Sequence, residues 1–151
     1  LLSMQQISLT SKRTAKPMLY SLWDIYMLLS AHGKWKSIDE NSGQPRSVVE
    51  ITESGGKIYG KIVRLFPQPN EDPDPVCDKC APSDPRFKKK VIGMEIITGL
   101  LKNGQEYSGG EILDPENGKI YRSKIWLEGK DLKVRGYWGP FYRTQTWLRT
   151  E

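Results

Sequence analysis

Short runs of alternating apolar and polar residues fill the chain from residue 33 onward, and turn-forming residues separate them. This pattern predicts β-strands, because alternation places one set of side chains on each face of a sheet. Ser-Gly-Gly at 54–56 and Asn-Gly at 103–104 mark tight hairpins, and Asp-Pro-Glu-Asn-Gly at 114–118 marks a further turn. The expected strands are residues 34–39, 47–53, 57–65, 93–102, 106–113, 120–128, 132–138 and 141–150.

The connections between these strands predict how the sheet closes. Six of the seven are hairpin-length, so neighbouring strands are expected to be antiparallel. The fold class is therefore all-β, an eight-stranded antiparallel up-and-down barrel whose interior is filled by side chains or holds one small ligand. Gly109-Gly110 predicts a bulge. The expected inward residues are Val49, Ile51, Ile58, Ile62, Met94, Ile96, Leu100, Tyr121, Ser123, Ile125, Leu127, Leu132, Val134 and Trp138.

Gly33 and Trp35 open the first strand, and Arg149 lies near the end of the last. In a closed antiparallel barrel these two strands pair, which brings Arg149 beside Trp35. A guanidinium stacked on an indole gains cation–π energy and can bond exposed carbonyls. This combination resembles the closed end of lipocalin-like barrels, and we expect it to be a structural plug.

The first 32 residues follow a different pattern. Residues 1–16 predict an irregular extension, and residues 17–32 predict a short helix covering the closed end, with a signal-like segment as the alternative. The longest apolar stretch, residues 18–29, is interrupted by Asp24 and is too short for the roughly 20 residues that span a bilayer. Residues 33–151 then form the barrel domain.

Charge and composition exclude some functions. The formal charge is +5, but Lys12, Arg13 and Lys16 precede the first acidic residue, and the remainder is nearly balanced. That balance argues against nucleic-acid binding, which needs basic residues gathered on one face. The single histidine, His32, adjoins the plug. We therefore expect no catalytic set made of a nucleophile, a base and an orienting group. We predict no enzyme activity, no cofactor and no metal.

Several motifs resemble an uncharacterised bacterial family of small exported proteins. They include Gly-Lys-Trp-Lys at 33–36, Ser-Val-Val-Glu-Ile at 47–51, the Cys-x-x-Cys pair and Arg-Thr-Gln-Thr-Trp-x-Arg at 143–149. The resemblance covers roughly residues 33–150. It implies a lipocalin-like, calycin-type barrel in a periplasmic or secreted protein. It implies no activity, so no catalytic residue is transferred.

The connection over residues 66–91 contains six of the ten prolines and both cysteines, and loops of this length are usually functional or mobile. For an exported protein we favour a disulfide between Cys77 and Cys80. A redox-active pair, a metal site and a reduced structural pair remain alternatives.

The barrel interior is the expected ligand site. Arg143 and Gln145 share the face of Trp147 on the last strand, and inward polar groups need a polar partner. We therefore predict an amphipathic ligand with an apolar body and an anionic or hydrogen-bonding end. The expected binding residues are Ile62, Ile96, Tyr121, Ile125, Val134, Trp138, Arg143 and Gln145.

The alternative function is an envelope interaction module that works through the proline-rich loop. Its basic cluster (Arg86, Lys88, Lys89 and Lys90) would contact anionic lipid or an acidic partner. Interior volume separates the two hypotheses. A pocket of about 300 Å³ or more favours ligand binding, and a packed interior favours the interaction module.

Overall fold

The computed structural model describes residues 21–22 and 30–150. The expected extension at 1–16 lies outside the described residues, and so do residues 17–20 and 23–29 of the expected helix at 17–32. No helix within the described part of the chain has the length and hydropathy to cross a membrane. The barrel belongs to a compact unit that begins at Ala31.

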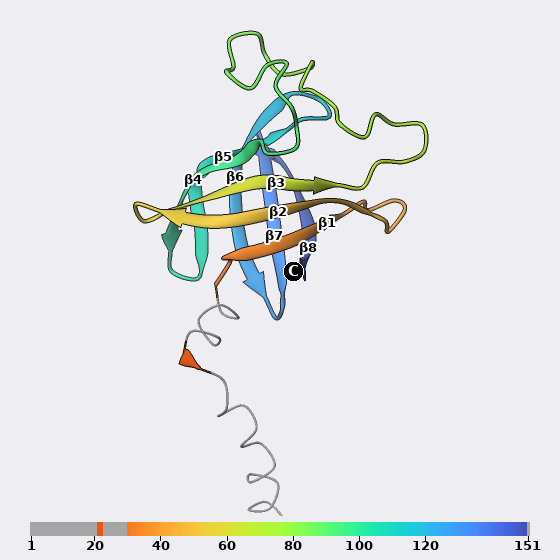
Figure 1. Ribbon diagram of the computed structural model, residues 1–151. Coiled ribbons are helices and arrows are strands. Elements are labelled where there is room, and N and C mark those ends of the chain that lie inside the picture. The colour runs from red at the N-terminus through yellow and green to blue at the C-terminus, as the bar shows by residue number, and fades with distance from the viewer. Residues whose placement is uncertain (1–20, 23–29, 151) are drawn as a thin grey trace, which may run out of the picture. The chain divides into compact units, whose positions relative to one another are not determined.

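Eight antiparallel strands form a closed barrel in sequence order, and β8 pairs with β1, so the predicted fold class is confirmed (Figure 1). One end of the barrel, the mouth, carries the turns after β1, β5 and β7 and the long β3–β4 connection. The other end, the closed end, carries the turns after β2, β4 and β6. The strands are β1 (Gly33–Ile38), β2 (Pro45–Ser54), β3 (Lys57–Leu65), β4 (Glu95–Asn103), β5 (Glu106–Asp114), β6 (Lys119–Glu128), β7 (Asp131–Trp138) and β8 (Phe141–Thr150).

The expected inward faces are correct over most of the barrel, with local shifts in register. The predicted bulge is present, because the β5–β6 register shifts between Tyr107 and Gly110. In β4 the alternation missed Ile97, which is fully buried together with Ile96. Ile97 fits because it pairs with Gly60, where an added Cβ would lie only 2.8 Å from Ile97 Cδ1.

The closed half of the barrel is tightly packed, because inward side chains from all sides meet there. An interior of this kind excludes water and supplies most of the favourable free energy of folding. The fully buried side chains of the barrel core include Trp35, Val49, Ile51, Ile97, Leu100, Ile125 and Leu132.

The plug at the closed end has the geometry that the sequence predicts. The Arg149 guanidinium carbon lies 4.2 Å from the centroid of the Trp35 ring, and Arg149 Nη1 donates to the His32 carbonyl at 2.9 Å. Trp35 Nε1 donates to the Ala31 carbonyl at 2.8 Å. Burial lowers the pKa of Arg149, since desolvation disfavours its charge. A side chain at Gly33 would meet Arg149 Nη1 at 3.0 Å, which explains the glycine there.

Candidate ligand cavity at the barrel mouth

A cavity of about 890 Å³ occupies the mouth half of the barrel. All eight strands contribute side chains to its lining, together with the β3–β4 connection. Single small-molecule sites commonly have this volume and this mostly apolar lining. The apolar side chains on this wall include Ile62, Leu65, Ile96, Ile112, Leu113, Val134 and Trp147.

Six of the eight predicted binding residues line this cavity, and two do not. Ile125 points inward as expected and is fully buried, but it does not line the cavity. The inward placement of Trp138 is wrong, because its side chain is 62% exposed. It shares the parity of Val134 but is the last residue of β7, beyond the rim, where the Lys119 ammonium lies 4.9 Å from its ring centroid. The six are Ile62, Ile96, Tyr121, Val134, Arg143 and Gln145.

Two polar side chains of the lining have donor groups available to a ligand. Gln145 Oε1 accepts a hydrogen bond from Trp147 Nε1 at 3.0 Å, which leaves the Gln145 amide hydrogens to donate elsewhere. The Tyr121 hydroxyl oxygen accepts from Asn117 Nδ2 at 3.1 Å, which leaves its own hydrogen free to donate. The wall therefore suits a ligand that offers hydrogen-bond acceptors.

Arg143 is already paired. Its Nη2 lies 3.1 Å from Glu40 Oε2 in the β1–β2 turn, and its side chain is 71% exposed. Among the described residues, Arg46 is the one further cation that lines the cavity, so this lining is acidic on balance. The carboxylates of the lining are Asp39, Glu40, Glu71, Asp72, Asp78, Asp114 and Glu116.

Asp114 is the carboxylate of the lining whose pKa responds to burial. Desolvation raises its pKa above that of an ordinary aspartate, although its Oδ1 accepts the Glu116 backbone N–H at 2.9 Å. A raised pKa means that the folded state favours the protonated form of Asp114. The resulting contribution to the free energy of unfolding is present below the ordinary aspartate pKa, and it is lost as the pH rises through the raised pKa of Asp114. Asp114 adds to the acidic side chains of the lining, which disfavour another negative charge in the cavity.

Arg46 ties three segments together at the mouth. Its guanidinium donates to both carboxylate oxygens of Glu71 in the β3–β4 connection, at 3.1 and 3.3 Å, and also to Glu116 in the β5–β6 turn. These bonds lower the pKa of Glu71 and raise that of Arg46. The sequence pattern did not reveal this clasp, because its members are 25 and 70 residues apart and each is typical of a solvated surface.

The β3–β4 connection folds back on itself beside the mouth (Figure 1). Val76 and Lys90 form an isolated antiparallel bridge, and Cys77 and Lys89 share a backbone hydrogen bond. Cys77 and Cys80 form a disulfide, which confirms the favoured prediction and removes the thiolates that a metal site would use. Within the described residues, no group of three or more His, Cys, Asp or Glu side chains is arranged to hold a metal.

Two of the four cations in the basic cluster of this connection are neutralised by ion pairs. Arg86 pairs with Asp84 at 2.8 Å and donates to the Glu95 carbonyl, and the Arg86 bonds lower the pKa of Asp84. Lys90 pairs with Asp74 at 2.8 Å. These pairs leave only Lys88 and Lys89 of the cluster outside the ion pairs of the described chain, which weakens its expected role at anionic lipid.

Comparison with known proteins identifies the family. The family model described as "Uncharacterized protein conserved in bacteria (DUF2147)" matches residues 33–149. The chain belongs to this bacterial family. The match covers the whole barrel from the plug glycine to Arg149, and it confirms the resemblance drawn from the sequence. A comparison with curated proteins finds no match.

A solved structure supports the fold of this DUF2147 member. Protein HP1028 from Helicobacter pylori, described as belonging to the lipocalin family, is similar with a TM-score of 0.66 and 20% sequence identity. The similarity covers 81% of this chain and 84% of that one. At this identity the likeness shows the lipocalin-like fold.

The disulfide of this DUF2147 member is expected to resist reagents in the folded state. Cys77 is fully buried and Cys80 is 3% exposed, so a reductant has little access to either sulfur. We expect no alkylation without reductant, little with reductant alone, and two labels with reductant plus denaturant. Intact mass after each treatment measures this, and two labels in the native, oxidised protein would contradict the disulfide.

Proposed function

We propose that this protein binds a small amphipathic molecule inside its lipocalin-like barrel, in the bacterial envelope and without turnover. The cavity of about 890 Å³ is the observation that carries the proposal. It exceeds the roughly 300 Å³ that a small-molecule site needs. An interior filled by side chains would instead favour the interaction module.

The lining supports a ligand with two chemically different ends. Ile62, Ile96 and Val134 offer an apolar wall for its body, and burying apolar surface there drives binding. Gln145 and Tyr121 offer hydrogen-bond donors for its polar end. The ligand body then lies against the strands, and its polar end lies toward the mouth.

The charges of the lining favour a ligand whose polar end is a neutral hydrogen-bond acceptor over a ligand whose polar end is anionic. Arg143 is matched by Glu40, and Arg46 is matched by Glu71 and Glu116. A ligand carboxylate would have to displace one of these partners, and it would also face the other acidic side chains of the lining. A carbonyl, ester or hydroxyl oxygen meets the available donors without that cost.

The envelope location rests on two supporting observations. The family is bacterial, and the motifs resemble those of exported proteins. The Cys77–Cys80 disulfide suits an oxidising compartment, since cytosolic thiols are usually kept reduced. We propose a periplasmic or secreted protein on this basis.

A binding role without catalysis agrees with the position of the single histidine. His32 lies at the closed end, with its carbonyl bonded to Arg149, away from the cavity lining. A histidine there cannot serve as the base for a nucleophile at the mouth. The similarity to a lipocalin-family structure likewise supports binding.

Val134→Trp is expected to weaken binding, because an indole at this buried position would project into the cavity from β7 and occupy part of the space against the apolar wall. We expect the affinity for N-phenyl-1-naphthylamine, a neutral fluorescent amphiphile, to fall at least tenfold. Dodecanol should displace this fluorophore from the parent protein more effectively than dodecanoate, which differs only in its charged end. Fluorescence titration measures both effects.

Lys130→Trp is the matched control, since it adds the same side chain in an exposed turn at the closed end. It should leave the affinity unchanged. Equal affinity of Val134→Trp and the parent would place the binding site outside the barrel. Native mass spectrometry of protein purified from its own source then identifies the natural ligand.

A further inference from the structure

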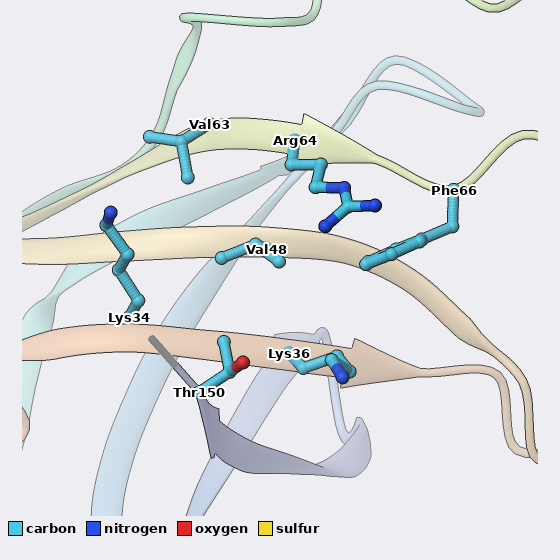
Figure 2. Close-up of a pocket in the computed structure, with 7 residues that line it drawn as sticks. All are labelled: Lys34, Lys36, Val48, Val63, Arg64, Phe66 and Thr150. Carbon is cyan, nitrogen blue, oxygen red and sulfur yellow. The ribbon is translucent and has the colours of Figure 1, made fainter.

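A second hollow, of about 290 Å³, lies on the outer wall of the barrel and shares only Phe66 with the lining of the ligand cavity. Figure 2 shows cationic side chains from β1 and β3 on either side of Val48 on β2. Strand alternation explains this grouping, because Lys34 and Lys36 flank the inward Trp35 and must point outward. The hollow is lined by Lys34, Lys36, Val48, Val63, Arg64, Phe66 and Thr150.

The three cations of this wall have no anionic partner. Across the described part of the chain, no ion pair involves Lys34, Lys36 or Arg64. Among the residues that the structure describes, no carboxylate lines the hollow. Glu50 is the cross-strand neighbour of Lys34, but it also lies opposite Lys61, so the wall stays positive.

Aromatic and aliphatic side chains hold these cations against the wall. The Arg64 guanidinium carbon lies 4.5 Å from the Phe66 ring centroid, and the Lys36 ammonium lies 5.9 Å from it. Val48 is only 5% exposed beneath them. Lys36 also pairs with Leu148 of β8, whose side chain is 42% exposed. Cations and apolar groups therefore alternate on one outer surface.

We propose that this outer wall docks the protein on an anionic lipid surface, with a lipid phosphate seated among Lys34, Lys36 and Arg64. The combination is typical of peripheral membrane contacts, in which Lys and Arg reach headgroups while apolar side chains enter the interface. The hollow has room for one headgroup, whereas an acidic protein segment would extend beyond it. Docking through the wall leaves the mouth free, so a ligand exchanges with the cavity while the protein stays at the membrane.

This surface is distinct from the basic cluster of the β3–β4 connection. Arg86 and Lys90 in that cluster already have carboxylate partners, whereas the wall cations have none. Membrane contact is therefore assigned to β1, β2 and β3 and not to the long connection. The two surfaces can be tested separately, because their cations lie on different elements of the chain.

The experiment is co-sedimentation of the full chain with sucrose-loaded vesicles. Vesicles of phosphatidylcholine with 30% phosphatidylglycerol should bind the parent protein, and pure phosphatidylcholine vesicles should not. The triple variant Lys34→Gln, Lys36→Gln, Arg64→Gln should bind at least tenfold more weakly, since each cation near an anionic surface contributes about a fivefold gain in affinity. Higher salt should reduce parent binding.

The matched control is Lys88→Gln, Lys89→Gln, Lys130→Gln, which removes the same charge from exposed positions elsewhere. It should bind within about twofold of the parent, since its cations lie off the proposed surface. Both triple variants retain residues 1–30, so any contribution of that segment to vesicle binding is the same in the two variants. Matching circular dichroism spectra and melting temperatures show that each variant is folded.

Three results would overturn the proposal. One is the absence of parent binding to phosphatidylglycerol vesicles, and another is equal binding of the wall variant and the parent. The third is retention on immobilised polyglutamate without vesicle binding, which would point to an acidic protein partner. None of these results bears on the ligand cavity, because the Val134→Trp titration tests that site in the absence of lipid.

Discussion

Trp35→Ala is expected to destabilise the barrel by about 3 to 5 kcal/mol, the usual cost of removing a large buried aromatic side chain. Trp35 is fully buried at the closed end, and its ring packs under the Arg149 guanidinium. The substitution leaves a cavity, removes the hydrogen bond to the Ala31 carbonyl and leaves Arg149 without its stacking partner. Chemical denaturation measured by circular dichroism gives the change in the free energy of unfolding.

Trp35→Phe separates packing from the polar part of the plug. It keeps an aromatic ring beneath Arg149 but loses the Nε1 hydrogen bond, so we expect a smaller loss of about 1 to 2 kcal/mol. Equal losses in the two variants would show that the hydrogen bond, and not the buried ring, stabilises the closed end. A loss below about 1 kcal/mol in Trp35→Ala would contradict the plug itself.

The barrel and its plug were predictable because they depend on local patterns. Alternation and turn residues identify each strand, hairpin-length connections order the strands, and closure then pairs β1 with β8. The observed register places Trp35 opposite Arg149, as that reasoning requires. The fold therefore follows from local sequence patterns, namely alternation and turn residues, together with the closure that pairs β1 with β8.

Other features depend on contacts that no local pattern contains. The burial of Ile97 follows from the missing side chain at Gly60 on the neighbouring strand. Trp138 has the alternation of an inward residue, but it is the last residue of β7 and its side chain is exposed. Alternation along a strand does not show where the barrel interior ends. The pairing of Arg143 with Glu40 spans 103 residues, so the sequence suggested an anchor for an anion where the structure has a neutralised pair.

Gly118→Ala is expected to disrupt the disulfide loop and destabilise the protein by about 2 to 4 kcal/mol, combining overpacking with backbone strain. Gly118 ends the β5–β6 turn with a φ of +75°, and an added Cβ would lie 1.8 Å from the Lys79 carbonyl oxygen. That oxygen belongs to the backbone between the two cysteines, so it can move only if the loop moves. Cys77 Sγ also lies 3.9 Å from the Pro115 carbonyl oxygen of the same turn, so the contact is part of a wider interface.

Gly104→Ala is the control that isolates this clash. Gly104 has a similar φ of +67°, but nothing lies within 4 Å of an added Cβ, so only the backbone cost of about 1 to 2 kcal/mol remains. Gly118→Ala should also speed trypsin cleavage in the β3–β4 connection and expose Cys77 and Cys80 to reductant without denaturant, and Gly104→Ala should do neither. If both variants behave alike, the β5–β6 turn does not hold the disulfide loop. If they differ as expected, this turn supports the loop through direct backbone contact, while Arg46 ties the same two segments together through Glu71 and Glu116.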